Sequence, residues 1–418
     1  MKSTTAVLAG WSARVVVVAC SLVNTRLLLN MLDVPAYAVY AIVLSLGPWF
    51  NLLALGVPNT AQNAIARHRA EGTDHRRLQH TVVNTAAAAA ALALVLCWPI
   101  GWVVQHTVLS GQDGMPTSAV ALMCFGLCLT ALTPVFNQVL FGLHRGLWPN
   151  VMPGLQSLTT TALLLTMSSL GLNGIDWAVA TFAGPALLVF VVLAKVAGAA
   201  PRHGIDWRQL KQVMVEGRHF LLFGLLSTGA LSADYIVMAR TLASPAIVEY
   251  NLASKVFTVL LTIHAVVLST SWSSLSDLHY RGHTEQLRRR VRSLLLVGVL
   301  VVLPAALLVV ALQADVFRLI GGARTVTVSM ALLALWPVYL LIRVWCDTFA
   351  LAHMSAGRVG TMNAYVAGQT AVSVAGQIWL GNRYGPAGIL AGISLSFLVT
   401  AAWILPVRFV HLTRANGS

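Results

Sequence analysis

The segment from Val82 to Val104, VVNTAAAAAALALVLCWPIGWVV, contains no charged residue over 23 positions. A helix needs about 20 apolar residues to cross the hydrocarbon core of a bilayer, so this segment alone predicts a transmembrane helix. Eleven further apolar runs fit the same rule. The twelve runs lie at about residues 8–30, 36–57, 82–104, 118–142, 151–172, 177–198, 219–242, 247–272, 294–312, 328–352, 361–380 and 385–408. The sequence therefore predicts an all-α polytopic membrane protein with about 12 transmembrane helices.

The composition agrees with that class. Hydrophobic residues make up 57% of the 418 residues and charged residues only 10%, whereas soluble domains are about 25% charged. The predicted spans leave only short connections, which excludes a sizeable soluble domain. All five cysteines lie in apolar stretches and none forms a C-x-x-C pair, so neither a disulfide framework nor a metal site is indicated.

The net charge of +14 is distributed unevenly over the connections between the predicted spans. Alternate connections on one side, starting with the N-terminus, hold 19 of the 27 lysines and arginines; the other side holds three and five lie within spans. Because basic residues concentrate in cytoplasmic connections, both termini are predicted to be cytoplasmic. The positive charge is therefore interpreted as a topology signal with an affinity for anionic lipid headgroups, and no nucleic-acid partner is expected.

The two halves of the chain resemble each other when residue i is placed over residue i+210. The matched pairs are Pro35 and Pro245, Ala36 and Ala246, Tyr40 and Tyr250, Gly72 and Gly282 and, after a one-residue slip, Gly146 and Gly357, and Gly174 and Gly385. Six predicted spans in each half give the halves the same orientation. We therefore expect two six-helix bundles, residues 1–205 and 206–418, related by a pseudo-two-fold axis along the membrane normal.

The repeated segments also carry a family resemblance. The sequence SPAIVEYNLASK at residues 244–255 and its counterpart VPAYAVY at residues 34–40 open corresponding spans. With the span count, loop lengths and repeat, they resemble the multidrug/oligosaccharidyl-lipid/polysaccharide (MOP) exporter superfamily, and most of all its Wzx-type polysaccharide flippases. The resemblance covers nearly the whole chain.

The resemblance implies a MATE-like fold and a function. Such a flippase moves an undecaprenyl-diphosphate-linked oligosaccharide, an O-antigen or exopolysaccharide repeat unit, from the cytoplasmic to the periplasmic leaflet of the bacterial inner membrane. It does so by alternating access, driven by a proton or sodium gradient and without another cofactor. A polysaccharide polymerase and a chain-length regulator are implied as partners.

A flippase for an anionic lipid needs cations within the bilayer, where each charge costs about 2.5–3.5 kcal/mol on insertion scales and is rarely idle. The five candidates are Arg14, Arg26, Arg240, Lys255 and Arg343. Arginine offers a bidentate fork to a diphosphate and lysine a point charge. Arg26 and Lys255 are the preferred contacts and are expected to hold the diphosphate jointly. Arg240, near a span end, is the best placed to snorkel to the interface.

Polar residues in the eighth predicted span follow a helical spacing. Asn251, Lys255, Thr258 and Thr262, continued by Ser269 and Ser273, fall on one stripe at 100° per residue. This pattern is typical of a helix that lines a wet cavity, and the predicted substrate-binding site therefore includes Asn251, Thr258 and Thr262. The alternative is a polar stripe that only joins helices to one another.

Three titratable residues within the spans are candidates for ion coupling: Asp234, Asp347 and His264. Asp347 lies four residues from Arg343, so the two can form a self-neutralising pair with Tyr339 nearby. Asp234 has no such partner in its own helix and needs a residue from another span, a cation or a proton. His264 is more typical of a buried bundle histidine than of a proton relay.

The sequence lacks the motifs of common enzymes. It contains no G-x-x-x-x-G-K-[ST], G-x-S-x-G or H-E-x-x-H, so the chain is interpreted as a secondary transporter and not an enzyme. A polytopic polymerase or glycosyltransferase remains an alternative, although the predicted external connections are too short for an acceptor-binding lobe. A MATE-like exporter of cationic drugs is the other alternative, but five basic and two acidic residues within the spans favour an anionic substrate.

The charge asymmetry generates a test of topology. Cysteines placed at Gly111 and Gly322 of a cysteine-free variant should react with an impermeant thiol reagent added to intact cells. Cysteines at Gly72 and Gly282 should react only after lysis, because their loops carry the basic excess. Labelling of Gly72→Cys in intact cells would reverse the predicted orientation.

Overall fold

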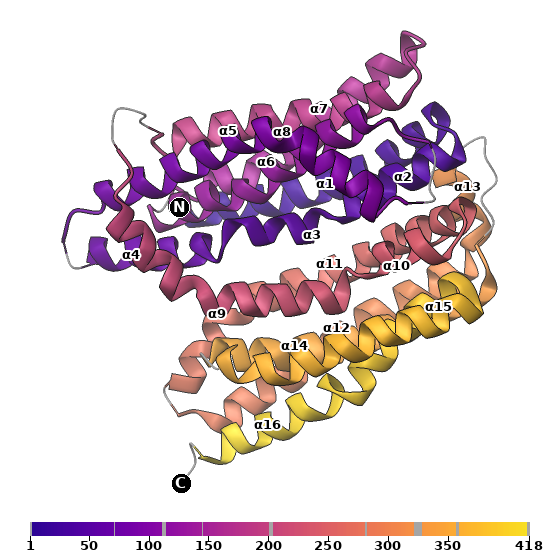
Figure 1. Cartoon of the computed structure of the whole chain (residues 1–418). Coiled ribbons are helices and arrows are strands. Elements are labelled where there is room, and N and C mark those ends of the chain that lie inside the picture. The colour runs from indigo at the N-terminus through magenta and orange to yellow at the C-terminus, as the bar shows by residue number, and fades with distance from the viewer. Residues whose placement is uncertain are drawn as a thin grey trace. The chain divides into compact units, whose positions relative to one another are not determined.

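The computed structural model describes residues 2–70, 72–110, 114–143, 145–199, 204–280, 282–321, 328–356 and 359–415, and the regular elements of these ranges are all helical (Figure 1). The chain divides into two compact units, Met1–Leu222 and Phe223–Ser418. The boundary expected after residue 205 falls just before helix α9 (Trp207–Leu231), and the chain divides within that helix.

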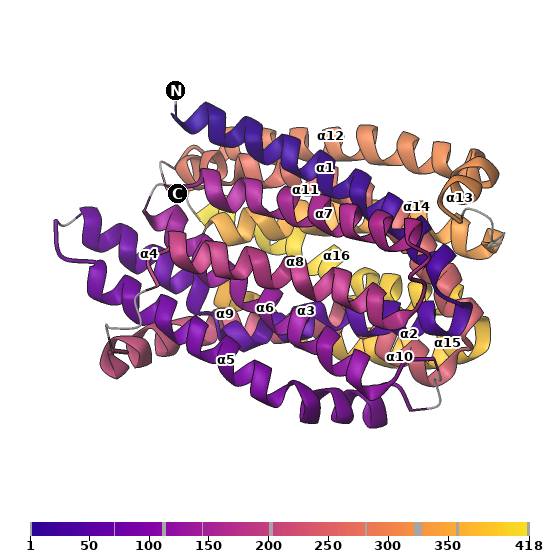
Figure 2. The same cartoon turned by 90° about the horizontal axis from the view of Figure 1, so that it is seen from above.

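The first unit is built around one central helix. Its elements are α1 (Lys2–Met31), α2 (Val34–Ser45), α3 (Gly47–Phe50), η1 (Asn51–Ala54), α4 (Val57–Ala70), α5 (Arg76–Thr107), α6 (Thr117–Gly142), α7 (Leu147–Ser169), α8 (Ile175–Val196) and the start of α9. Helix α6 packs against α4, α5 and α8, and α1 packs along α7 (Figure 2). Because α6 is apolar on nearly all sides, it is mostly buried, as expected for the core of a bundle.

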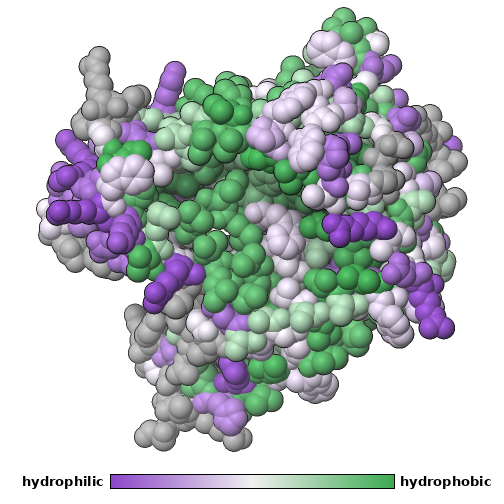
Figure 3. Space-filling model, viewed as in Figure 1, coloured by the Kyte–Doolittle hydropathy of each residue, from purple (hydrophilic) through white to green (hydrophobic). Residues whose placement is uncertain are grey.

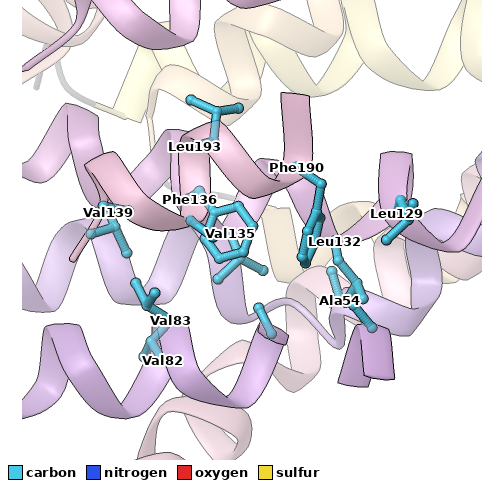
Figure 4. Packing of buried hydrophobic residues seen from close by; sticks show 14 of the residues in the cluster. Ala54, Val82, Val83, Leu129, Leu132, Val135, Phe136, Val139, Phe190 and Leu193 are labelled. Atoms are coloured by element: carbon cyan, nitrogen blue, oxygen red, sulfur yellow. The ribbon is translucent and has the colours of Figure 1, made fainter. Parts of the chain in front are cut away.

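Aromatic and branched side chains of α6 fill the core of this unit (Figure 4). The rings of Phe136 and Phe190 meet edge to face, with centroids 4.9 Å apart. Small residues let the helices approach closely: a Cβ on Gly126 would lie 2.8 Å from Cε1 of Phe182 on α8. Helix association in lipid depends on such close packing, because lipid tails are as apolar as the helices themselves.

The second unit repeats this plan around α14 (Met330–Ser355), which packs against α11, α12, α15 and α16. Its other elements are the end of α9, α10 (Asp234–Thr241), α11 (Ser244–Tyr280), α12 (Thr284–Ala311), α13 (Gln313–Gly321), η2 (Val359–Met362), α15 (Asn363–Val399) and α16 (Ala401–Ala415). The predicted span at 219–242 is divided between two helices, since α9 ends at Leu231 and α10 begins at Asp234, although Ala233 between them keeps right-handed helical dihedrals (φ −81°, ψ −16°).

The long helix α15 reverses direction at Gly385. This glycine has φ +61° and precedes Pro386, which has no N–H to continue the helix. The helical segments before and after Gly385 pack against each other. Their close approach is seen at Gly376, where an added Cβ would lie 3.1 Å from the Cα of Gly392. The reversal separates the predicted spans at 361–380 and 385–408.

Among the described residues, ten helical stretches are long and apolar enough to cross a membrane. One of them, Asn363–Thr413, contains the reversal at Gly385 and so holds two of the predicted spans. Helix α7, 23 residues long and lying on the predicted span at 151–172, is not among the ten. The prediction of an all-α polytopic membrane protein is confirmed. Counting the stretch with the reversal as two spans and adding α7 gives about 12 spans.

Two glycines matched by the repeat end corresponding helices in the same way. Gly72 and Gly282 follow α4 and α11 with φ of +69° and +73°. The amide of Thr73 donates to the carbonyl of His68 at 2.8 Å, and that of His283 to Leu278 at 3.0 Å. This six-to-one hydrogen bond with a left-handed glycine closes a helix and satisfies a carbonyl that would otherwise lack a donor. The sequence repeat is therefore also a repeat of local structure.

Within the first unit, the segment before α9 is bound to α5 by an ion pair and a hydrogen bond. The guanidinium of Arg77 pairs with Asp206 at 2.9 Å, and the amide of Asp206 donates to Thr81 Oγ1 at 3.2 Å. Further along, α9 touches the turn before α4, where a Cβ on Gly217 would lie 3.1 Å from the carbonyl carbon of Gly56. These contacts explain why the division between the units falls inside α9 and not before it.

The surface divides by polarity. Hydrophobic residues cover much of the face seen in Figure 3, and hydrophilic residues gather toward its left edge, where Figure 1 places α4. Exposed leucines and valines of α5 and α12, such as Leu94, Val95, Leu296 and Leu300, are 58%, 74%, 63% and 70% exposed. Apolar exposure on this scale suits lipid and would be costly in water.

The matched glycines generate a stability prediction. Gly72→Ala and Gly282→Ala should each destabilise the fold by about 1 kcal/mol or more, because a Cβ is strained in the left-handed region. The matched control is Gly184→Ala within α8, where an added Cβ meets nothing within 4 Å. Thermal unfolding of the purified protein in detergent would measure the difference. Unchanged unfolding temperatures for both loop variants would contradict the role given to these glycines.

Candidate functional site

A cavity of about 300 Å³ lies inside the second unit, between α10, α11, α14 and α15. The polar and aromatic residues that line it are Asp234, Tyr250, Ser254, Thr258, Thr262, Trp336, Tyr339, Arg343 and Asp347. Five of these, Asp234, Thr258, Thr262, Arg343 and Asp347, are residues that the sequence predicts for substrate binding or ion coupling. The structure thus brings candidates from three helices to one place.

Arg343 and Asp347 form an ion pair within α14, as predicted. The guanidinium Nη2 donates to Asp347 Oδ2 at 2.9 Å, and Nε lies 3.2 Å from both carboxylate oxygens. Nη1 donates to the hydroxyl of Tyr339 at 3.0 Å. A guanidinium carries five N–H groups, and the contacts within the described residues use three of them. Two N–H groups therefore remain for a ligand. Asp347 neutralises the arginine without using all of its donors.

Asp234 begins α10 and receives two hydrogen bonds. Its Oδ1 accepts from the amide of Tyr235 at 3.0 Å, and its Oδ2 accepts from the hydroxyl of Tyr250 on α11 at 2.9 Å. In turn, Asn251 on α11 donates to the hydroxyl of Tyr235 at 2.7 Å. We call Asp234, Tyr235, Tyr250 and Asn251 the α10–α11 clasp. The partner on another span that Asp234 was predicted to need is Tyr250.

The clasp lies at the break between α9 and α10. A buried carboxylate is favourable there, because the N-terminus of a helix carries a partial positive charge. Asp234 is 8% exposed. Interrupted helices in membrane proteins are tolerated where the freed backbone lines a cavity, and such breaks are common at ligand sites in transporters.

Trp336 gives the cavity an aromatic wall that the sequence did not predict. The residue is 2% exposed, and its indole N–H has no hydrogen-bond partner within the described ranges. Its ring stacks on Phe257 with centroids 5.3 Å apart and meets Tyr339 edge to face at 5.5 Å. A buried donor without a partner is costly, so we interpret this N–H group as a donor for an acceptor on a ligand. The hydropathy of the span does not distinguish this tryptophan from one that lies at the membrane interface. The neighbouring Tyr250, in contrast, was marked in the sequence by its match with Tyr40 in the repeat.

The polar stripe of α11 is displaced from its predicted register. Thr258 and Thr262 line the cavity, and Ser254 joins them one helical turn earlier. Lys255 is half-buried and is not part of the lining, and Asn251 faces the clasp. The side chains of Ser269 and Ser273 lie outside the described residues.

The remaining predicted cations are not among the residues that line this cavity. Arg14 and Arg26 are exposed on α1 of the first unit, and Arg240 is exposed near the end of α10. Arg26 and Lys255 belong to different units, so their joint contact with a diphosphate stays a prediction.

His264 is buried between α11, α12 and α14. The hydroxyl of Thr348 donates to the carbonyl of Val344 at 2.7 Å. The same hydroxyl oxygen can therefore accept a hydrogen bond from Nε2 of His264, 3.3 Å away. Gly298 on α12 makes room for the ring, since a Cβ there would lie 2.6 Å from its Cε1. The ring is 2% exposed and does not line the cavity, which agrees with the interpretation as a buried bundle histidine.

A metal-binding cluster was not expected from the sequence. Among the described residues, no group of three or more His, Cys, Asp or Glu side chains is placed to hold a metal ion.

Comparisons with known proteins decide the fold family. The chain superimposes on the "Inward-facing conformation of a multidrug resistance MATE family transporter of the MOP superfamily" with a TM-score of 0.72 at 15% identity, covering 97% of this chain and 99% of that one. The chain has the MOP exporter fold. The "Lipid II flippase MurJ, inward closed conformation" matches that fold with a TM-score of 0.71 at 14% identity, over 99% of this chain and 90% of that one.

Sequence comparisons find similarity to proteins of polysaccharide biosynthesis and O-antigen export. Residues 155–327 match the model of a family described as "Polysaccharide biosynthesis protein". The "Putative O-antigen export protein" of Yersinia pseudotuberculosis is 26% identical over 411 residues, which cover 96% of this chain and 94% of that protein. The predicted resemblance to the MOP superfamily, and to its polysaccharide exporters, is therefore confirmed.

Proposed function

We propose that this MOP-fold protein translocates an undecaprenyl-diphosphate-linked oligosaccharide from the cytoplasmic to the periplasmic leaflet of the bacterial inner membrane. The observation that carries the proposal is the similarity to an O-antigen export protein over almost the full length of both chains. In this proposal the termini are cytoplasmic, in line with the charge asymmetry. The translocated unit would be elongated by a polysaccharide polymerase with a chain-length regulator.

The chemistry of the cavity in the second unit supports an oligosaccharide or phosphate ligand. Arg343 offers two N–H groups beyond those that bind Asp347 and Tyr339, and Trp336 offers a buried indole N–H. A few convergent donors in a cavity with apolar and aromatic walls are the usual means of orienting a polar ligand. A phosphate at Arg343 would compete with Asp347 for the guanidinium, which links ligand binding to the charge state of Asp347.

We predict that the candidate cations act through charge and geometry. Lys255→Glu should reduce export of surface polysaccharide more than Lys255→Ala, because glutamate adds repulsion where alanine only removes attraction. Arg26→Lys and Arg343→Lys should each lose most of the function if bidentate binding matters. Loss of one charge-assisted contact should weaken binding by about 1.5–3 kcal/mol.

The assay is complementation of a flippase-deficient strain, with the amount of each variant in the membrane measured in parallel. Arg383→Gln, which removes an exposed charge at a span end, serves as the matched control. Full export by Lys255→Glu at wild-type membrane levels would remove Lys255 from the mechanism. The proposed function itself fails if the wild-type chain restores no export.

A second prediction concerns coupling at Asp234. If its carboxylate carries the coupling ion, Asp234→Asn should abolish gradient-driven transport in proteoliposomes while the protein still folds. Tyr250→Phe separates this role from a structural one, because it removes the 2.9 Å hydrogen bond and keeps the carboxylate. That variant should retain gradient dependence. Equal loss in both variants would assign Asp234 to the α10–α11 clasp alone.

A multidrug exporter is the second candidate, and one observation favours it. Asp234 and Asp347 share an aromatic-lined cavity, which is a suitable environment for an organic cation. Such an exporter would lower the susceptibility of its host to cationic dyes and would not restore surface polysaccharide. The complementation strain therefore distinguishes the two functions when both outcomes are measured in it.

A further inference from the structure

A second polar cavity, of about 480 Å³, lies at one end of the first unit. The side chains that line it are His75, Arg76, Gln79, His80, Leu143 and Arg145. They come from the start of α5 and from the connection between α6 and α7, 63 or more positions apart in the chain. The volume falls in the range of about 300–1,000 Å³ typical of small-ligand sites.

The charge of this cavity is not balanced by its neighbours. Arg77 is the one residue of the run His75–Arg77 that has an ion pair in the described structure, and it pairs with Asp206. Asp74, two residues before the helix begins, accepts from the amide of Arg76 at 2.9 Å and does not line the cavity. Arg76 and Arg145 are exposed, and in the described part of the chain no carboxylate pairs with either guanidinium. Two arginines and two imidazoles thus face one space whose lining contains no acid.

The walls of the cavity are held in place by other contacts. Gln79 Nε2 donates to the carbonyl of Ala197 at 2.8 Å. His80 Nδ1 must carry a hydrogen and donate to the carbonyl of Gly198 at 2.9 Å, because a carbonyl can only accept. The amide of Arg145 donates to the carbonyl of Leu140 at 2.8 Å, which fixes the loop that carries it. A positively charged site on a fixed backbone binds an anion without a large ordering cost.

We propose that this cavity binds a phosphate-bearing anion, a monophosphate or diphosphate group held between Arg76 and Arg145. A guanidinium group matches the geometry of phosphate oxygens, two of them line this cavity, and the positive end of α5 adds to their field. The group can belong to a lipid headgroup or to a soluble phosphate compound. The site lies wholly within the first unit, so the inference does not rest on the function proposed for the cavity of the second.

The test uses the full-length protein in phosphatidylcholine nanodiscs, titrated calorimetrically with inorganic diphosphate. The double variant R76Q/R145Q should bind about tenfold more weakly for each arginine lost, whereas R76K/R145K should retain part of the affinity. The matched control is R290Q/R292Q, which removes two exposed charges at the start of α12 in the second unit. Thermal unfolding of each variant verifies that the fold is intact.

A second measurement distinguishes the sources of the phosphate group. In nanodiscs that also contain phosphatidic acid, a headgroup site should lose its affinity for diphosphate. Native mass spectrometry should then find phosphatidic acid retained by the wild type and the control but not by R76Q/R145Q. A site for soluble phosphates should instead bind diphosphate equally in both membranes. Equal weakening in R76Q/R145Q and R290Q/R292Q, or no binding of either probe by the wild type, would overturn the proposal.

Discussion

The bilayer imposes the constraint on which the rest of this structure depends: backbone and side-chain polar groups within it must find partners inside the protein. Many serine and threonine hydroxyls of the described spans find such a partner locally, by donating to a carbonyl three or four residues earlier, as Thr130 and Thr133 do in α6. Charged groups cannot be satisfied in this way. In the second unit, three of them, Asp234, Arg343 and Asp347, line one cavity.

Local patterns in the sequence predict those features whose residues lie within one helix or at its end. The spans could be predicted because length and hydropathy alone decide them, and the Arg343–Asp347 pair because a four-residue spacing brings the two side chains together. The turn at Gly72 and its copy at Gly282 were visible as matched glycines. Each of these features depends on residues that are close in the chain.

Features that depend on contacts between helices could not be predicted. Helical periodicity shows that α11 has a polar stripe but not which neighbour it faces, so the lining runs through Ser254 and not Lys255. The bond between Tyr250 and Asp234 joins two helices across a break that hydropathy does not reveal, since both sides of the break are apolar. Trp336 was missed because a tryptophan within a span has the same sequence signal whether it faces lipid or a cavity.

The repeat places neutral residues in the first unit where two charged candidate residues stand in the second. At the offset of 210, Tyr40 matches Tyr250, but Asn24 stands in place of Asp234 and Ser45 in place of Lys255. The first unit is filled by an apolar core, whereas the second encloses a polar cavity around Arg343. Two copies with the same charges would double the cost of placing ions in the bilayer. A first copy that is neutral at these two matched positions avoids that cost there, whereas its Arg76 and Arg145 are exposed at helix ends.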